Sequence, residues 1–284
     1  MAGARAHAAV AYADSIAALR LLRRTALLAS ALMLIVVAAS AYLRLRHAGA
    51  PCADASACGE ADALIVLART AHRVAAGGVA VLIVALIVIT RGQPRLRGHA
   101  RLAGGALAIA IALALLGTGM SAFAPGNTPS AVIVGNLAGG FALLALMATS
   151  WAGASAQIAD ANGWNVPASV RRMLVLSVVI AGIAVALGGL ASDGIAGARS
   201  AHRFAGWVLV ALVGTLLVMS RRAPRPWCAW RPLVNLLLMA QVLLGVAQAY
   251  VAPSLAMTLA HNLAAAALVA ALAATTYRAY VVDT

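Results

Sequence analysis

The fold of this protein is decided by apolar stretches such as MLVLSVVIAGIAVALGGLAS, residues 173–192. None of its twenty residues is charged. An α-helix of about 20 residues spans the hydrocarbon core of a lipid bilayer, which is roughly 30 Å thick. This stretch is therefore long enough and apolar enough to form a transmembrane helix.

Similar stretches recur along the whole chain. Of its 284 residues, 64% are hydrophobic and 10% are charged, and the mean hydropathy is +0.96. A soluble domain of this composition would not stay in solution. The stretches are much longer than the alternating strands of a membrane barrel, so they are predicted to be helices. We predict an all-α integral membrane protein with eight transmembrane helices, at residues 24–43, 63–90, 102–124, 131–151, 173–192, 201–220, 233–252 and 255–277.

Arginine predicts how the chain is oriented in the membrane, because all 21 basic residues are arginine. They concentrate in the N-terminal arm, after the second apolar stretch, before the fifth and between the sixth and seventh. By the positive-inside rule these segments and both termini are cytoplasmic, and the predicted location is a bacterial-type inner membrane. The formal net charge of +14 is then matched by anionic lipid headgroups, and we predict no binding to nucleic acid.

Two of the three cysteines, Cys52 and Cys58, lie in the first predicted outer loop. Disulfides form and persist outside the cytoplasm. Two unpaired thiols are the alternative, but the close spacing favours a bridge between Cys52 and Cys58.

The chain also contains an internal repeat. Ala-His-Arg occurs at 71–73 and 201–203, Leu-Leu-Gly at 115–117 and 243–245, Asn-Leu-Ala at 136–138 and 262–264, and Ala-Gly-Ala at 48–50 and 196–198. With four helices in each repeat, both halves have the same orientation in the membrane. The predicted organisation is two tandem, same-orientation four-helix bundles. Its parts are an N-terminal arm at 1–23, a first bundle at 24–151, a linker at 152–172, a second bundle at 173–277 and a tail at 278–284.

The six histidines fall into two groups. His7, His47 and His99 lie in the predicted arm or loops, where we expect solvated side chains. His72, His202 and His261 lie within apolar helices, where an ionisable group is costly and usually functional. A hydrogen bond to a neighbouring helix is the alternative reading for a single histidine of this kind. Because His72 and His202 occupy equivalent positions of the repeat, we favour a shared role as ligands.

Heme suits this arrangement, because two imidazoles on facing helices can hold its iron while apolar helix faces pack on the ring. His202 and His261 are the predicted pair in the second bundle, with His72 as a candidate in the first. Zinc or copper would need further ligands, which these helices lack. Arg73 and Arg203 directly follow two of the histidines. A guanidinium there can pair with heme propionates, although anchoring at the membrane interface explains each arginine equally well.

With these residues in place, the chain resembles the heme A synthases, membrane enzymes that convert heme O to heme A for cytochrome oxidase. Their first outer loop has an Arg-Leu pair, a glycine and a cysteine pair, matched here by Arg44-Leu45, Gly49, and Cys52 with Cys58. The His-Arg pairs at 72–73 and 202–203 also match, as does the stretch from Gln241 through Pro253 to His261. The resemblance covers nearly all of residues 24–277.

The resemblance implies that His202 and His261 hold heme b in the second bundle, and that His72 binds the substrate heme in the first. The implied reaction is oxidation of a heme O methyl group to the formyl group of heme A, with electrons relayed by heme b from an unnamed donor. His72 would then be a catalytic residue. The implied partners, besides lipid and heme, are heme O synthase and cytochrome oxidase assembly factors.

The first half departs from the family pattern at three positions. Gly135 stands where the repeat places the counterpart of His261, leaving Asn136 as the nearby polar residue. Arg69 replaces the family's glutamate three residues before the histidine, and Ala55 replaces a tryptophan. A non-catalytic heme b protein for electron transfer, heme handling or oxidase assembly is therefore the alternative function. A transporter is a weaker one, because no interrupted helix pair is evident.

Overall fold

The computed structural model describes residues 2–48, 63–120, 129–158, 166–222, 230–252 and 254–281. Within these residues all regular structure is helical, and eight helices are long and apolar enough to cross a membrane. The prediction of an all-α protein with eight membrane-spanning helices is thus confirmed. The helices are α1 (Ala2–Ala48), α2 (Ala63–Thr90), α3 (Arg97–Met120), α4 (Ser130–Ile158), α5 (Ala168–Ser192), α6 (Ala198–Met219), α8 (Arg231–Tyr250) and α9 (Leu255–Val281), with short 3₁₀ turns η1 (Pro94–Leu96) and η2 (Ser220–Arg222).

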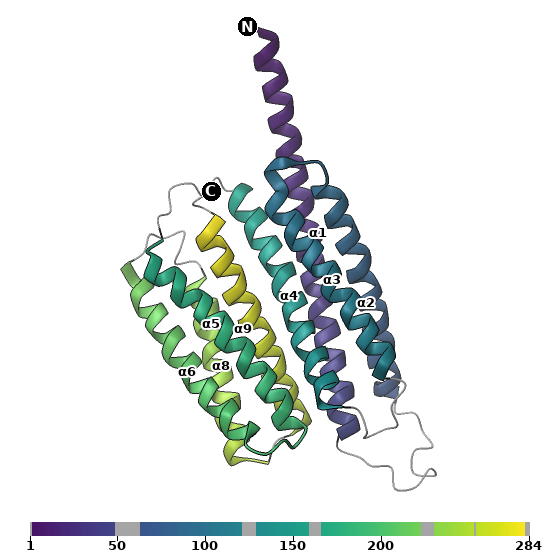
Figure 1. Ribbon diagram of the computed structural model, residues 1–284, viewed down its shortest axis with the longest axis vertical. Helices are drawn as coiled ribbons and strands as arrows, with labels where there is room; N and C mark the ends of the chain where they lie inside the picture. Colours follow the sequence, from purple (N-terminus) through teal and green to yellow (C-terminus); the bar gives the residue numbers. More distant parts are fainter. Residues whose placement is uncertain are drawn as a thin grey trace.

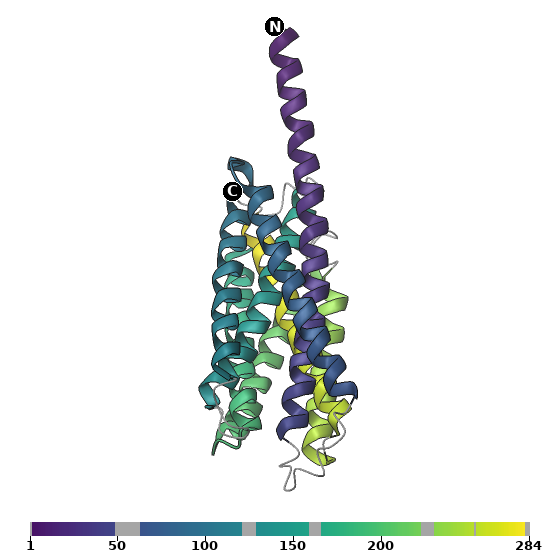
Figure 2. The ribbon, with the colours of Figure 1, turned by 90° about the vertical axis from the view of Figure 1, so that its right-hand side faces the viewer.

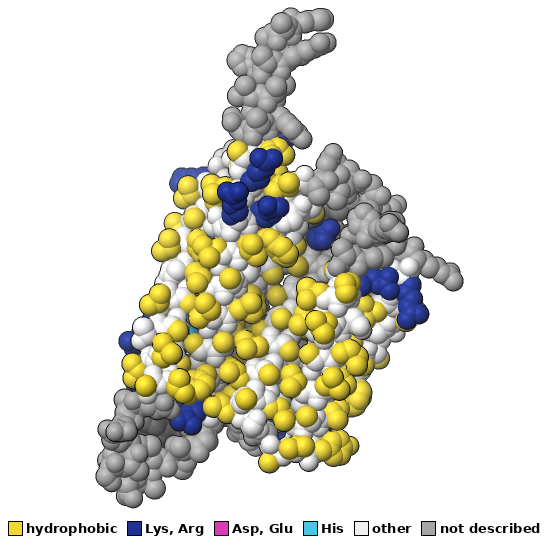
Figure 3. Space-filling view, turned by 180° about the vertical axis from the view of Figure 1, so that it is seen from behind, with side chains coloured by type: hydrophobic (Ala, Val, Ile, Leu, Met, Phe, Trp, Pro, Cys, Tyr) yellow, Lys and Arg dark blue, Asp and Glu magenta, His cyan; other side chains and the backbone are white. Residues whose placement is uncertain are grey.

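The surface of the helices is apolar in a way that suits lipid. Large hydrophobic side chains point outward along the spans, among them Phe204, Val74 and Val81, which are 72%, 70% and 68% exposed. Figure 3 shows hydrophobic side chains over the middle of one face, with arginines toward the ends of the helices. In water such a surface would drive aggregation. In a bilayer it faces hydrocarbon, and the chain is a multi-pass membrane protein.

The helices pack mainly with other helices of the same half of the chain (Figure 1). In the first half α1 contacts α2 and α4, and α3 contacts α2 and α4. In the second half α9 contacts α5 and α8, and α6 contacts α5 and, less extensively, α8. The two groups meet chiefly along α4 and α9. The start of α1 and the end of α9 lie at the same end of the molecule (Figure 1).

Helix α1 extends well beyond the predicted span at 24–43. It is one continuous helix of 47 residues, about 70 Å long at 1.5 Å per residue. Its N-terminal part projects past the other helices (Figure 2). The arm at 1–23 lacks proline and is rich in alanine, leucine and arginine, which favour helix, so nothing in its sequence ends the helix before the span. Helices α4 and α5 likewise run into the predicted linker at 152–172, to Ile158 and from Ala168.

The helices that carry His72 and His202 each bury one stripe of residues. On α2 the buried residues are Ala75, Val79, Ile83, Leu86 and Thr90, and on α6 they are Ala198, Ala205, Leu209, Val213 and Leu216. The spacing of three, four or seven residues keeps each stripe on a single helix face. His72 precedes Ala75 by three positions, as His202 precedes Ala205. Both histidines therefore lie at the edge of the face that packs inward.

A tight turn joins α5 to α6. Gly194 has a φ of +78°, the backbone N–H of Ile195 donates to the carbonyl of Leu190, and that of Gly194 donates to Ala191. This is the Schellman arrangement that commonly ends helices, and it favours glycine at the left-handed position. Gly197, with a φ of +75°, then starts α6. The turn sends the chain back directly, so that the first turns of α6 lie beside the last turns of α5.

Candidate functional site

The second half brings the side chains of His202 on α6 and His261 on α9 close together. Their ring centroids are 6.3 Å apart, and the ring planes are nearly perpendicular, at 77°. Bonds between imidazole nitrogen and a metal ion are about 2 Å long, so two imidazoles on opposite sides of one ion have ring centres roughly 6 Å apart. The separation of the two rings is thus of the size needed for a metal held between them.

Both histidines are set in place by contacts with the neighbouring helices. Nδ1 of His202 donates to the carbonyl oxygen of Ala184 on α5, at 2.8 Å. This bond leaves the other ring nitrogen, Nε2, as the one with a free lone pair, the arrangement usual for histidine ligands of metals. On the other side, the side chain of Gln241 on α8 donates to the carbonyl oxygen of His261, at 2.7 Å. Nδ1 of His261 is buried and has no hydrogen-bond partner among the described residues.

Glycines make room for these rings. A Cβ atom at Gly188 on α5 would lie 3.1 Å from Cε1 and 3.2 Å from Nδ1 of His202, closer than ordinary side-chain contacts. At Gly245 on α8 it would lie 3.6 Å from Cε1 of His261, an ordinary contact. A side chain at position 188 would therefore displace the imidazole that donates to Ala184.

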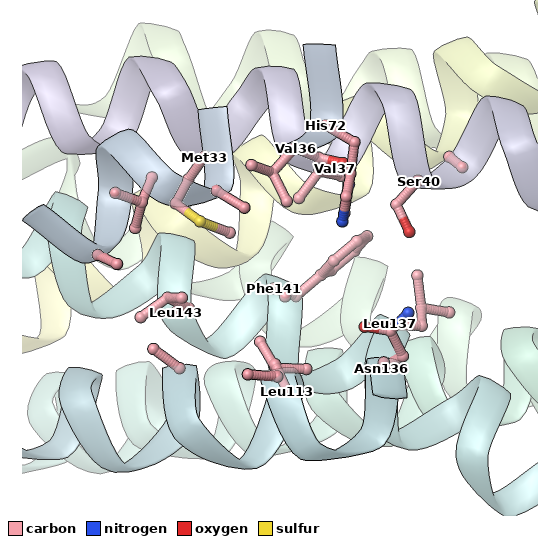
Figure 4. A pocket seen from close by; sticks show the side chains of 18 of the residues that line it. Met33, Val36, Val37, Ser40, His72, Leu113, Asn136, Leu137, Phe141 and Leu143 are labelled. Carbon is pink, nitrogen blue, oxygen red and sulfur yellow. Dashed lines mark hydrogen bonds between the residues drawn. The ribbon is translucent and has the colours of Figure 1, made fainter. Parts of the chain in front are cut away.

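The first half encloses a cavity of about 400 Å³ that all four of its helices line. Figure 4 shows His72 and Ser40 pointing into it from α2 and α1, with Phe141 and Asn136 of α4 on the opposite side. Most of the wall is apolar. This volume lies within the range of about 300–1,000 Å³ that is usual for small-molecule sites.

His72 is held in the same manner as His202. Its Nδ1 lies 3.4 Å from the carbonyl oxygen of Val36 on α1. The Ala-Gly-Ala repeat at 48–50 and 196–198 has an offset of 148 residues, and the same offset carries Val36 onto Ala184. The two histidines thus face equivalent backbone carbonyls. An imidazole Nδ1 that faces a backbone carbonyl of the preceding helix is thus found in both halves, while the arrangement as two tandem bundles stays a prediction.

The sequence names Arg44 as part of the Arg-Leu pair that matches the family's first outer loop, but not as a residue of the site. In the structure Arg44 lies within α1 and lines the cavity together with Ser40, His72 and Asn136. The signal was present in the spacing along α1. Met33, Val37, Ser40 and Arg44 recur every three or four residues, which places them on one helix face.

Other predicted residues lie outside the cavity. Arg73 and Arg203 are exposed, and Arg69 is exposed on α2. Gly135 is not among the lining residues, and a Cβ atom there would meet Cδ1 of Leu116 at 3.4 Å. Cys52 and Cys58 lie outside the described residues, so their predicted bridge stays a prediction.

The expectation of a solvated His99 is wrong. His99 lies in the first turn of α3 and is 2% exposed, with its ring centroid 6.1 Å from that of Tyr277 on α9. Neither ring nitrogen has a hydrogen-bond partner in the described part of the chain. The turn η1 leads straight into α3, so positions 96, 99, 103 and 106 form one buried stripe rather than a loop.

The described residues contain no group of three or more His, Cys, Asp or Glu side chains that could hold a bare metal ion. A pair of imidazoles in apolar surroundings does fit a heme, because the porphyrin supplies the four remaining iron ligands. His202 and His261 are the residues that would hold it. Comparison with known protein families and with curated protein sequences gives no match.

Proposed function

We propose that the protein is a heme A synthase-like membrane oxidoreductase, which oxidises a methyl group of heme O to the formyl group of heme A for cytochrome oxidase biogenesis. The observation that carries the proposal is the His202–His261 pair, whose ring centroids are 6.3 Å apart. Beside it stands a second, differently built site, the cavity at His72. A bound heme b in the second half would supply an iron that exchanges single electrons.

In this proposal the two halves have different roles, electron transfer in the second and substrate binding in the first. Nδ1 of His202 is engaged with the carbonyl oxygen of Ala184, which leaves Nε2 of this ring as the nitrogen that can bind a metal. Two strong ligands leave no open position on an iron, which suits electron transfer. In the first half His72 faces a cavity instead of a second histidine, so a substrate heme there would have one protein ligand and an open side.

The resemblance in sequence and the charge distribution support the further parts of the proposal. The arginine-rich segments favour a bacterial-type inner membrane with cytoplasmic termini. Converting a methyl group to a formyl group removes four electrons and adds one oxygen atom, so the function requires an oxidant. With molecular oxygen in this role, each of two successive hydroxylations takes two electrons from a donor and releases water, and loss of water from the doubly hydroxylated carbon gives the formyl group. Heme O synthase, cytochrome oxidase assembly factors and that electron donor are the partners that this function requires.

A direct test is to express the chain in a bacterial host that makes heme O but no heme A, and to extract and separate its pigments. Heme A is expected only when the chain is present, and it should disappear in the His72→Ala and His202→Ala variants. If heme O stays unconverted while the purified protein contains heme b, the enzymatic proposal is wrong.

That second outcome would favour the non-catalytic alternative, a heme b protein for electron transfer, heme handling or oxidase assembly. A specific observation speaks for it. Gly135 and Arg69 stand where the resemblance leads one to expect a histidine and a glutamate in the first half. Arginine cannot act as a proton acceptor at working pH.

A further inference from the structure

The cavity of the first half has a polar end and an apolar end. Arg44 lies near the last turn of α1, His72 in the first third of α2 and Asn136 in the second turn of α4. Because neighbouring helices are antiparallel, these residues share one end of the bundle, next to the connection at 49–62. Met33 and Leu143 line the other end, toward the middle of the spans (Figure 4). A ligand that matches this wall is an amphiphile with one polar edge.

Arg44 gives the polar end its charge. Its Nε is buried and has no hydrogen-bond partner within the described residues. Side chains on a helix lean toward the N-terminus, so Arg44 leans back toward Ser40 and the cavity instead of the membrane surface. A guanidinium in apolar surroundings is costly unless an anion accompanies it. The cavity therefore offers a cation that a bound anion would satisfy.

The second half has no counterpart of this cation. The offset of 148 residues carries Arg44 onto Ser192, whose hydroxyl donates to the carbonyl oxygen of Gly189 at 2.7 Å. The positive charge is thus present at this position in the first half and not at the equivalent position in the second. Arg73 is a less suitable partner for a ligand in the cavity, because it is exposed and does not line the wall.

We infer that Arg44 binds a carboxylate of the porphyrin-class ligand in this cavity and so fixes the ligand with its carboxylate edge toward the 49–62 end and its apolar edge toward Met33 and Leu143. The inference rests on the proposed function. Arginine suits the task, because its planar guanidinium binds a carboxylate through two parallel hydrogen bonds, which fixes orientation as well as affinity.

The test is a fluorescence titration of the purified full-length protein with metal-free protoporphyrin IX and with its dimethyl ester. Neither probe needs an iron ligand, and the ester lacks the carboxylates. The variants are Arg44→Gln and Arg44→Lys. Arg46→Gln is the control on the same helix, and Arg73→Gln tests whether Arg73 binds the carboxylate instead. Ala76→Phe, which fills the cavity, should lower the affinity for both probes and so locate the binding.

We expect the natural protein to bind the acid about tenfold or more tightly than the ester, as for a charge-assisted hydrogen bond. Arg44→Gln should bind the two probes alike, Arg44→Lys should keep part of the preference, and Arg46→Gln should keep all of it. An unchanged preference in Arg44→Gln, or its loss in Arg73→Gln, would overturn the inference.

Failure of the proposed function gives a different pattern. If neither porphyrin binds but a fatty acid does, with an affinity that falls in Arg44→Gln, Arg44 is a carboxylate partner and the porphyrin assignment is wrong. Conversely, if acid and ester bind equally well in the natural protein, the cavity accepts porphyrin and the role of Arg44 is wrong. A helical circular dichroism spectrum and a size-exclusion elution volume equal to those of the natural protein show that each variant has folded.

Discussion

In the first half Nδ1 of His72 lies 3.4 Å from the carbonyl oxygen of Val36, and in the second Nδ1 of His202 lies 2.8 Å from that of Ala184. From this shared arrangement the halves diverge. The second places His261 opposite its histidine, whereas the first has Gly135 at the equivalent position and a cavity of about 400 Å³ in front of His72. A histidine that faces a backbone carbonyl thus has a second histidine opposite it in one half, the closed site, and a cavity in front of it in the other, the open site.

The largest expected effect is the loss of the closed site. His202→Ala and His261→Ala should each abolish the low-spin heme spectrum of the purified protein, because each removes one of two axial ligands. Absorption spectra of oxidised and reduced protein measure the change. His7→Ala, which alters a histidine outside the membrane spans, is the control. An unchanged low-spin spectrum in both variants would show that this pair does not hold the heme.

The second prediction concerns the open site. A heme in the first half should be high-spin and bind carbon monoxide, and this reactive fraction should vanish in His72→Ala. Gly135→His should convert it to a low-spin form if the new imidazole reaches the iron. Space exists for a side chain, since a Cβ atom at 135 meets its nearest neighbour at 3.4 Å.

Gly135→Ala is the matched control, because it adds a side chain without a ligand atom and should leave the heme high-spin. Protein with one heme per chain that does not react with carbon monoxide, and whose spectrum is the same in His72→Ala, would contradict an open heme site.

The third prediction tests the support of His202. Gly188→Ala places a Cβ atom 3.1 Å from the imidazole, so we expect the ring to shift by a few tenths of an ångström and to weaken its hydrogen bond to the carbonyl oxygen of Ala184. Loss of such a supporting contact typically weakens metal binding about tenfold to a hundredfold. Heme dissociation into apomyoglobin measures it. Gly182→Ala on the same helix, where no atom lies within 4 Å, should bind heme normally. Equal heme retention in both variants would show that the contact between His202 and the carbonyl oxygen of Ala184 does not contribute to heme binding.

The sequence predicted the spans because these depend on runs of apolar side chains, whereas the tandem arrangement of two bundles, inferred from residues at fixed offsets, stays a prediction. It also placed His72, His202 and His261 within membrane spans, as the structure does, and His202 lies beside His261. It did not predict the position of His99 or Arg44. Both depend on which helix face packs inward, and near a helix end the apolar pattern is too short to show that. The length of α1 was missed because hydropathy marks the membrane span and not the helix.

A fourth prediction concerns the junction between the halves, where α4 meets α9. A Cβ atom at Gly153 would lie 2.6 Å from Cε1 of Tyr277 and 2.9 Å from Cε1 of His99, so Gly153→Ala should push the helices apart. Overpacking of this kind typically costs about 1–3 kcal/mol. The melting temperature in detergent should fall by a few degrees. Gly104→Ala, with no atom within 4 Å, should leave it unchanged. A normal melting temperature in Gly153→Ala would show that the junction can adjust.

The smallest expected effect is that of the predicted bridge between Cys52 and Cys58, which distinguishes the outer loops of the two halves. Labelling of thiols before and after reduction should show these two cysteines reactive only after reduction. The third cysteine, Cys228, is the internal control, because it lies in the arginine-rich segment between the sixth and seventh predicted helices, which is predicted to be cytoplasmic. If both residues are labelled without reductant, in protein from an oxidising compartment, the predicted bridge does not form.

The turn between α5 and α6 affects how readily each site assembles. Five residues separate these helices, whereas fourteen separate α1 from α2. Closing the longer connection costs about 1 kcal/mol more in chain entropy. The α5–α6 hairpin should therefore form early and bring His202 to Ala184 before the rest of the bundle packs. In the first half, a Cys52–Cys58 bridge would restrict the unfolded chain. It would thereby lower the entropy cost of bringing His72 close to Val36.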